Sequence, residues 1–326
     1  MLTAEGQLGF GSWVDAHCDT ILRLYKQKRH LTDESSDGHL DLPRMQKGGI
    51  GLQFFAVWIE PIYKPDRALL QTLEVFEYFH AEMDRAADKI RWIRNQEDVF
   101  TFQKQGGPAA LLAIEGGEPV VSLQILRMLF RLGLRALTLT WNERNAIADG
   151  AGEEGTRGGL SHFGKDVVLE MHRLGMVVDV SHIAEPGFWD VLSLSERPVI
   201  ATHSNAKAIH PHRRNLTDEQ LDALKKVGGV TGLNLYPPFV GSGAVGLEQL
   251  LAHVHHIVDR VGPNHLGLGA DFDGINKTPL GFSDVTTMPR LAEALSAAGY
   301  KDEDVRKMMG ENILRVLAQV LPREEI

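Results

Sequence analysis

The sequence is short of cysteine, of long apolar runs and of positive charge. Its 326 residues include one cysteine, Cys18, which excludes an intrachain disulfide framework. No stretch approaches the roughly 18 apolar residues that a membrane-spanning helix needs, and no basic segment followed by an apolar one marks a secretory leader near the first residues. The net charge of −9, from 34 Lys and Arg against 43 Asp and Glu, argues against a general nucleic-acid surface. We therefore expect a cytoplasmic protein without a membrane or nucleic-acid partner.

Two further absences bear on the fold. No Gly-x-Gly-x-x-Gly motif follows the first apolar run, which argues against a dinucleotide-binding fold. No low-complexity linker divides the chain, and its composition, 43% hydrophobic and 24% charged, is that of an ordinary globular protein. We expect one domain over residues 1–326.

Short apolar runs recur along the chain, each closed by polar residues or glycine and followed in most cases by a helical pattern. The runs are Trp13–His17, Gly51–Val57, Ala110–Glu115, Arg135–Thr140, Met176–Ser181, Val199–His203, Val230–Leu235 and Leu266–Asp271. Runs of about four to eight apolar residues without strict alternation are typical of parallel strands buried on both faces. The helical patterns cover 65–87, 119–132, 161–174, 217–227, 246–261, 289–298 and 301–321. This alternation predicts an α/β fold, a (β/α)₈ TIM-type barrel, with residues 26–45 and 150–159 as long loops on its active face.

The first run ends in His17-Cys18-Asp19. If this segment is an extended strand, the side chains of His17 and Asp19 lie on one face and Cys18 on the other. An imidazole nitrogen and a carboxylate oxygen on one face can bind a divalent metal such as zinc. Cys18 is then expected to face the helix layer as a structural thiol.

Polar residues also close other runs: Glu115 the third, His182 the fifth, His203 the sixth and Asp271 the eighth. In such barrels the active site forms at the carboxyl ends of the strands. Burying these groups unpaired would cost several kcal/mol each, whereas a metal centre satisfies them. The ligand count exceeds one tetrahedral zinc and suits two metal ions that share a carboxylate, a centre that activates water for hydrolysis.

Each of these residues also has a purely structural interpretation. Glu115 could cap the next helix, and His182 or His203 could be an ordinary interior histidine. Asp271 could begin a turn, and Asp273, in an Asp-Gly pair, fits a turn better than a ligand. Seven further histidines fall in loops or helices and are expected to be surface or capping residues: His162, His172, His210, His212, His253, His255 and His256.

Two segments suggest substrate contacts. Arg213 or Arg214, in the motif IHPHRRN after the sixth run, could bind a substrate carboxylate with two hydrogen bonds, or could belong to a solvated basic loop. Trp141 ends the fourth run and could line a pocket or belong to the core.

The ordered motifs DAHCDT, AIEGGEP, LTLTWN, VVDVSH, THSN, HRRN, NLYPPF and GADFDGI resemble those of the renal (membrane) dipeptidase family of zinc metallopeptidases over nearly the whole chain. The resemblance implies an amidohydrolase-type barrel with two Zn²⁺ ions and a dipeptide substrate. It assigns one zinc to His17 and Asp19 and the other to His182 and His203, with Glu115 bridging. It also places Arg214 on the C-terminal carboxylate of the dipeptide and gives Asp271 the proton transfer, and it implies attack by a hydroxide held between the metals. Dipeptides with a D-residue at the C-terminal position are among the implied substrates, and a homodimer is one possible assembly.

The sequence departs from the family pattern at Trp141, where the family has a histidine after Leu-Thr. An indole nitrogen only donates and carries no charge, so stabilisation of the transition state would depend more on the metals. This departure leaves open another amidohydrolase activity, such as a deaminase or lactonase, on the same barrel. A binding protein without activity is the third hypothesis.

Overall fold

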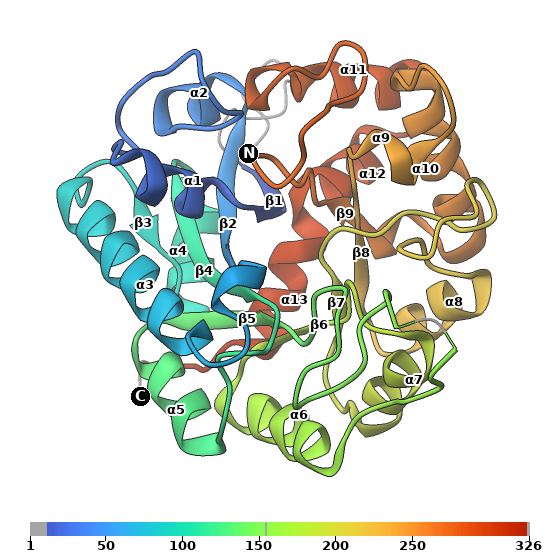
Figure 1. The fold of residues 1–326 in the computed structure, drawn as a ribbon. Helices are drawn as coiled ribbons and strands as arrows, with labels where there is room; N and C mark the ends of the chain where they lie inside the picture. The colour runs from blue at the N-terminus through green and yellow to red at the C-terminus, as the bar shows by residue number, and fades with distance from the viewer. Residues whose placement is uncertain (1–11, 154, 325–326) are drawn as a thin grey trace.

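The strands form a closed parallel barrel. The computed structural model describes residues 12–153 and 155–324. Its strands are β1 (Trp13–Cys18), β2 (Ile50–Trp58), β3 (Arg91–Trp92), β4 (Ala109–Glu115), β5 (Leu134–Thr138), β6 (Val177–Asp179), β7 (Ile200–Ala201), β8 (Val230–Leu233) and β9 (Leu266–Leu268). The order is β2-β1-β9-β8-β7-β6-β5-β4, and a β2–β4 pairing closes the circle (Figure 1). The predicted (β/α)₈ barrel is confirmed.

One strand lies outside this circle and outside the predicted runs. The two residues of β3 pair only with Ala109 and Ala110 at the start of β4. The pairing of β5 with β4 begins further along, at Leu112. A strand of two residues is too short to leave a periodic signal in the sequence.

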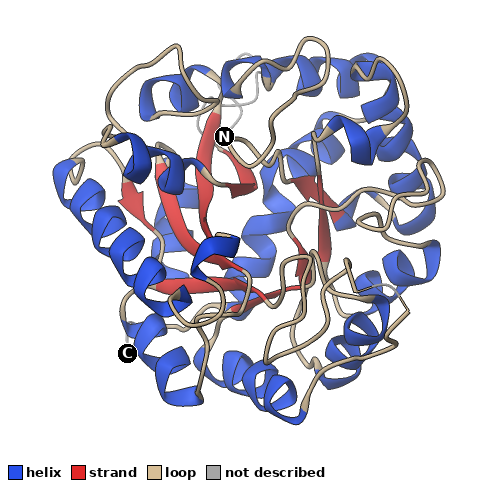
Figure 2. Cartoon of the chain, in the orientation of Figure 1, coloured by secondary structure: helices blue, strands red, loops and turns tan. Residues whose placement is uncertain are grey.

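Helices surround the barrel (Figure 2). They are α1 (Thr20–Gln27), α2 (Leu42–Lys47), α3 (Ala68–Arg85), α4 (Gln96–Gln105), α5 (Leu123–Arg131), α6 (His162–Leu174), α7 (Glu185–Leu194), α8 (Asp218–Lys226), α9 (Pro237–Val240), α10 (Leu247–Val261), α11 (Pro289–Ala297), α12 (Asp302–Arg306) and α13 (Asn312–Val320), with short 3₁₀ or π turns η1 (Pro61–Tyr63), η2 (Pro263–His265), η3 (Val285–Thr287) and η4 (Lys307–Glu311). Within the described residues, no helix combines the length and the apolar character needed to cross a membrane.

The last predicted helix, 301–321, is broken at Gly310. This residue has φ 176° and ψ −39° inside the π turn η4. A Cβ atom there would lie 2.9 Å from the carbonyl oxygen of Ser12 and 3.0 Å from the nitrogen of Val14. The close approach of β1 therefore requires glycine at this point, and the chain forms α12 and α13 instead of one helix.

Alternating side chains build two apolar layers. Along β4, Ala109, Leu111 and Ala113 point into the barrel, while Leu112 and Ile114 pack under the outer helices. The inner layer also contains Ile313 and four further apolar residues of α13, which pack against the starts of the strands. Since α13 covers the amino ends, the polar site lies at the carboxyl ends of the strands.

The pairing of β1 with β2 shifts register between Asp15 and Cys18, which changes the side to which the last residues of β1 point. Asp15 is opposite Gln53 of β2, but Cys18 is opposite Phe55, so β1 has one residue more than its partner over this interval. Cys18 is fully buried in the layer under the helices. Asp19 is not in extended conformation, because it occupies the N-cap position of α1 with φ −99° and ψ 14°. The extended-strand argument was therefore wrong for Asp19.

An ion pair between Arg127 of α5 and Glu170 of α6 links these two helices. It gives the first testable prediction. The carboxylate of Glu170 accepts hydrogen bonds from Arg173 Nε at 2.8 Å and from Arg127 Nε at 2.6 Å. Mainly through Arg173, these bonds lower the pKa of Glu170 to about 2. Both arginines are well exposed, at 61% and 39%, so we expect Glu170→Gln to lower the free energy of unfolding at pH 7 by only about 1 kcal/mol.

The pH dependence of this loss follows from the direction of the shift. A pKa that is lower in the folded state gives stability that is full above the unfolded value, about 4.5, and is lost as the pH falls towards 2. Urea unfolding of chelator-treated wild type and Glu170→Gln should therefore differ less at pH 3 than at pH 7. Equal differences at the two pH values would contradict this account.

Candidate metal centre

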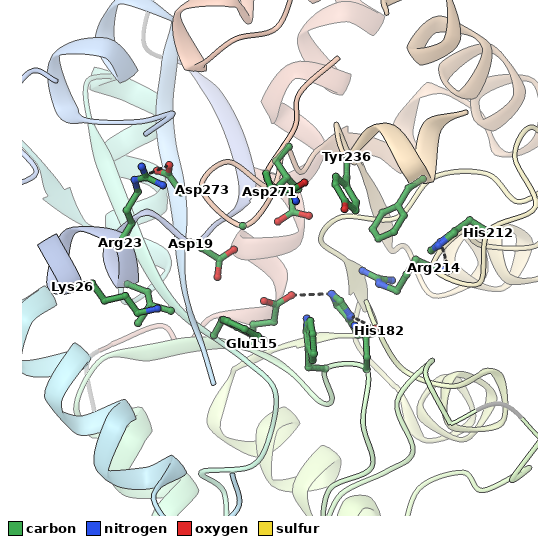
Figure 3. A pocket seen from close by; sticks show the side chains of 18 of the residues that line it. Asp19, Arg23, Lys26, Glu115, His182, His212, Arg214, Tyr236, Asp271 and Asp273 are labelled. Carbon is green, nitrogen blue, oxygen red and sulfur yellow. Dashed lines mark hydrogen bonds and ion pairs between the residues drawn. The ribbon is translucent and has the colours of Figure 1, made fainter. Parts of the chain in front are cut away.

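The side chains of the five predicted ligands meet at the open end of the barrel. Around Glu115 Oε1 lie the Nε2 atoms of His182 at 2.9 Å, His203 at 3.3 Å and His17 at 3.6 Å. His17 Nε2 is also 3.7 Å from Asp19 Oδ2. Figure 3 shows Asp19, Glu115 and His182 directed toward a common space. All five residues are buried.

These residues form two overlapping groups with metal-ligand spacing. One is His17, Asp19 and Glu115, and the other is Glu115, His182 and His203, with the ligand atoms of each group within 4.8 Å of one another. Glu115, the last residue of β4, belongs to both groups. The next helix, α5, is capped by Ser122, so Glu115 does not serve as its cap.

His182 lies in a loop after β6 and has a left-handed backbone with φ 65°. Asp271 and Asp273, after β9, have φ 65° and 64°. Such conformations cost energy for residues other than glycine and cluster at functional sites. His182 Nδ1 lies 3.1 Å from Asn142 Oδ1 and therefore donates to it, which leaves Nε2 free to face Glu115.

Burial and neighbouring carboxylates shift the pKa values of the three histidines and of Glu115. Burial alone would lower the pKa of His17, but Glu115, Asp19 and Asp271 together raise it to about 10. Burial also raises the pKa of Glu115 well above its ordinary value. His182 and His203 have pKa values well below the usual range because of burial, so both are neutral, the form in which histidine binds metals.

The residues present fit zinc. His17 Nε2 and Asp19 Oδ1 are buried and have no hydrogen-bond partner within the described structure. His182 Nε2 and His203 Nε2 are 2.9 Å apart, so two imidazole nitrogens face each other. Imidazole nitrogens and carboxylate oxygens are zinc ligands, and a cation among them satisfies every one of these atoms.

A cavity of about 650 Å³ opens over these ligands. Figure 3 shows Arg214, Tyr236 and His212 on one side of it and Arg23 and Lys26 on the opposite side. Among the lining residues, Asp19, Glu115, His182 and Asp271 provide the polar floor. The cavity is therefore continuous with the candidate metal centre.

Arg214 is a buried cation without an ion-pair partner among the described residues. It is 4% exposed, whereas Arg213 is exposed. Its guanidinium makes long hydrogen bonds to Ser204 Oγ at 3.4 Å and to the carbonyl oxygen of His203 at 3.3 Å. No ion pair among the described residues includes it. Burial lowers its pKa to about 10, so it is charged at neutral pH and suited to an anionic substrate group.

Asp271 and Asp273 have different surroundings. Asp271 accepts a hydrogen bond from Asn234 Nδ2 at 3.0 Å, and burial raises its pKa to about 7. Asp273 accepts from the backbone of His39 at 2.8 Å and from Thr20 Oγ1 at 2.7 Å. Asp273 therefore lies in a turn, as expected. It connects the loop after β9 to the start of α1 and to the loop that contains His39.

Trp141 lies in the wall of the cavity. Its ring centroid is 5.1 Å from that of Trp58, and Lys64 Nζ lies 5.1 Å from the ring centroid. Lys64 is itself 2.9 Å from Glu118 Oε1. Two tryptophan rings thus form an aromatic wall on this side of the cavity.

Of the histidines in loops and helices, His253 differs from expectation and His212 lies at the cavity. His253 is fully buried, with Nε2 donating to the carbonyl oxygen of Val240 at 2.9 Å and Nδ1 accepting from the backbone of Ala206 at 3.2 Å. His212 lines the cavity and its ring lies 4.4 Å from that of Phe239. The interpretation of His253 as a surface residue was wrong, because position on a helix does not determine burial. His212 is half-exposed, as expected, and accepts from the backbone of Arg214 at 3.1 Å. Asn142, Asn234 and Trp58 were not identified from the sequence at all.

Gly274 gives the second prediction. A Cβ atom there would lie 2.1 Å from Asp19 Oδ2 and 2.4 Å from Asp271 Oδ1. Because a contact this short forces both carboxylates to move, we expect Gly274→Ala to lower kcat/KM by about 100-fold, the usual cost of a displacement near 1 Å. Zinc content and dipeptide hydrolysis would be measured together. Gly241→Ala is the control, because its backbone is extended with φ 179° and a Cβ there would meet only side-chain carbons at 3.6 and 3.7 Å. A Gly274→Ala enzyme with wild-type activity would contradict the prediction.

Together, the closed barrel and the ligands at its carboxyl ends define a metal-dependent hydrolase. A sequence profile of the membrane dipeptidase family, peptidase family M19, matches residues 11–324. The chain is 34% identical to the dipeptidase verJ of Clonostachys rogersoniana over 297 residues, which cover 86% of this chain and 76% of that protein. It is 35% identical to the dipeptidase tcpJ of Claviceps purpurea over 295 residues, 87% of this chain and 69% of that one.

Solved structures agree. A metallopeptidase from Rhodobacter sphaeroides, liganded with a phosphinate mimic of the dipeptide L-Ala-D-Ala, is 31% identical with a TM-score of 0.88, covering 96% of this chain and 100% of that chain. A dipeptidase described as an M19 metallopeptidase is 33% identical with a TM-score of 0.88, covering 96% and 99%. The chain belongs to the membrane dipeptidase family and is a metallo-dipeptidase.

Proposed function

We propose that this metallo-dipeptidase holds two zinc ions and hydrolyses dipeptides with a free C-terminal carboxylate, including L-Xaa-D-Xaa dipeptides. The observation that carries the proposal is Glu115 Oε1, which is shared by two ligand groups on the floor of a cavity that also contains the buried Arg214. His17 and Asp19 would hold one zinc, and His182 and His203 the other. The mimic of L-Ala-D-Ala bound to the Rhodobacter sphaeroides relative supports the inclusion of L-Xaa-D-Xaa dipeptides among the substrates.

When bound, a zinc pair of this kind activates a shared water for attack and polarises the scissile carbonyl. The chain's own residues bind the substrate and move the proton. Arg214 would bind the C-terminal carboxylate with two hydrogen bonds, which restricts substrates to short peptides because a longer peptide has no carboxylate at that position. Trp141 and Trp58 would form an apolar wall that excludes water from the reacting bond.

Asp271 would carry the proton from the attacking water to the amine nitrogen as the carbon–nitrogen bond breaks. Its position in the cavity and a pKa near 7 suit this exchange. Asn234 Nδ2 holds Oδ2 of the carboxylate at 3.0 Å, which leaves Oδ1 directed to the reaction. Trp141, which replaces the family histidine, takes no part in moving the proton.

A dipeptide panel tests the proposal. Purified enzyme with added zinc would be assayed on L-Ala-D-Ala, L-Ala-L-Ala and the tripeptide L-Ala-D-Ala-D-Ala, before and after chelation. We expect hydrolysis of dipeptides, loss of activity with the chelator and its return with zinc. Activity that is indifferent to the chelator, or equal rates on the tripeptide, would overturn it.

Asp271→Asn gives the third prediction. Without a titratable carboxyl at this position, kcat should fall by roughly 10²- to 10⁴-fold, whereas bound zinc should be retained because Asp271 is outside both ligand groups. Steady-state kinetics and metal analysis on the same sample provide the measurement. Asp273→Asn, which changes a carboxylate that holds the loop, is the matched control and should affect stability more than kcat. An Asp271→Asn enzyme with wild-type kcat would remove Asp271 from the mechanism.

A further inference from the structure

Behind the metal centre, a buried hydroxyl contacts the rear nitrogens of two proposed zinc ligands. Thr202, directly after β7, is 3% exposed. Its Oγ1 lies 2.8 Å from His203 Nδ1 and 3.4 Å from His17 Nδ1. The direction of the hydroxyl proton therefore decides which nitrogen of these imidazoles is free to face a cation.

The Asp179 carboxylate fixes that direction. Its Oδ1 accepts the backbone N–H groups of Ser181 and Thr202, each at 2.9 Å. Its Oδ2 lies 2.6 Å from both Thr138 Oγ1 and Thr202 Oγ1, a distance typical of a hydroxyl that donates to a carboxylate. Both hydroxyls donate to Oδ2, so the proton of Thr202 points to Asp179.

With its only proton committed, Thr202 Oγ1 can only accept from the histidines. The shorter contact places a proton on Nδ1 of His203 and leaves an unprotonated Nε2, which lies 3.3 Å from Glu115 Oε1. The second acceptor position of Oγ1 is shared by His17 Nδ1 and Ser181 Oγ, which is 3.3 Å away. His203 is therefore held more firmly than His17.

The four hydrogen bonds that Asp179 accepts also show whether it is a metal ligand or only orients Thr202. A carboxylate oxygen of Asp179 lies within 4.8 Å of ligand atoms of His17 and His203, so the three form another possible metal group. Both oxygens of Asp179, however, already accept two donors each. Coordination of a cation would leave buried donors without partners, at a cost of about 1–3 kcal/mol each. Asp179 thus acts through Thr202 and not as a ligand.

We infer that Thr202 is a positioning residue for the metal centre: its hydroxyl, oriented by Asp179, fixes His203 as the Nδ1–H tautomer and presents Nε2 to the zinc. This inference rests on the proposed two-zinc function. Partners of this kind behind a metal-bound histidine typically change metal affinity by roughly 10- to 100-fold.

Three variants test the inference through zinc affinity, measured on metal-free protein by competition with a chromophoric chelator. Thr202→Val keeps the branched shape without the hydroxyl and should bind zinc at least 10-fold more weakly, whereas Thr202→Ser should remain within about threefold of wild type. The matched control is Thr231→Val in β8, which removes a buried hydroxyl that donates to the carbonyl oxygen of Ser204 at 2.6 Å. It should lower the melting temperature without changing zinc affinity. Wild-type affinity in Thr202→Val would overturn the inference.

A spectroscopic measurement covers the case in which Thr202→Val does not fold. Long-range ¹H–¹⁵N spectra of metal-free wild type, labelled at histidine and assigned with His203→Gln, report the tautomer directly. We expect a protonated Nδ1 and an unprotonated Nε2 at His203, and the reverse pattern would refute the inference. If wild type binds no zinc, the proposed function fails, but the tautomer is still decided by this spectrum.

Discussion

Replacement of Glu115 by glutamine is expected to abolish dipeptide hydrolysis, with kcat/KM lower by on the order of 10⁴-fold or more, and to reduce bound zinc from two ions to at most one. Glutamine keeps the size of the side chain but removes the charge that both ligand groups share. In the wild type, the Nε2 atoms of His182, His203 and His17 lie 2.9, 3.3 and 3.6 Å from the Oε1 atom of the glutamate. An uncharged amide there leaves Asp19, which belongs to one group only, as the single carboxylate among the proposed ligands of two buried cations.

The measurement is elemental analysis together with hydrolysis of L-Ala-D-Ala on the same preparation. Glu118→Gln is a matched control, because the side chain of Glu118 is only 5% exposed and pairs with Lys64 at 2.9 Å but belongs to neither ligand group. It should retain two zinc ions. If Glu115→Gln kept both ions and more than a few per cent of the activity, Glu115 would not be the bridge.

Arg214→Met is expected to lower kcat/KM for dipeptides with a free carboxylate by roughly 10²- to 10³-fold, since loss of one partner of a buried charge pair costs about 2–5 kcal/mol. Methionine retains an unbranched apolar stem that can pack near Phe239, whose ring lies 5.6 Å from the guanidinium carbon. Substrates whose C-terminus is an amide cannot form the ion pair in either enzyme. Their kcat/KM should therefore change much less.

The informative quantity is the ratio of kcat/KM for L-Ala-D-Ala to that for L-Ala-D-Ala amide. Arg214→Met should reduce this ratio, and Arg213→Met should leave it near the wild-type value because Arg213 is exposed. Zinc content controls for damage to the metal centre, since Arg214 contacts the backbone of His203. An unchanged ratio in Arg214→Met would show that another group binds the carboxylate.

The sequence predicted the barrel because its strands are buried on both faces. Apolar runs such as Gly51–Val57 stand out against helical segments, and β2 occupies Ile50–Trp58. Segments that do not differ from their neighbours in hydrophobicity were not predicted as helices or strands. The helix α1 begins at Thr20, directly after the candidate ligands, and its first turn contains no acidic residue that would mark a start. The π turn at Gly310 depends on contact with β1, which local sequence does not contain.

The candidate ligands could be identified because they stand at the ends of four predicted strands of a parallel barrel, where topology alone brings the ends together. Residues that act through a second side chain had no such signal. Asn142 and Asn234 become relevant only through their contacts with His182 and Asp271. The choice between Arg213 and Arg214 likewise depends on burial, and adjacent arginines in a loop give no periodicity from which burial could be predicted.

The most direct test of the central claim is a crystal structure of the zinc-reconstituted protein with anomalous data collected on both sides of the zinc absorption edge. The account predicts two anomalous peaks, one among His17, Asp19 and Glu115 and the other among Glu115, His182 and His203, with Glu115 in contact with both. A single peak, a peak coordinated by Asp179, or no peak in an active preparation would contradict it.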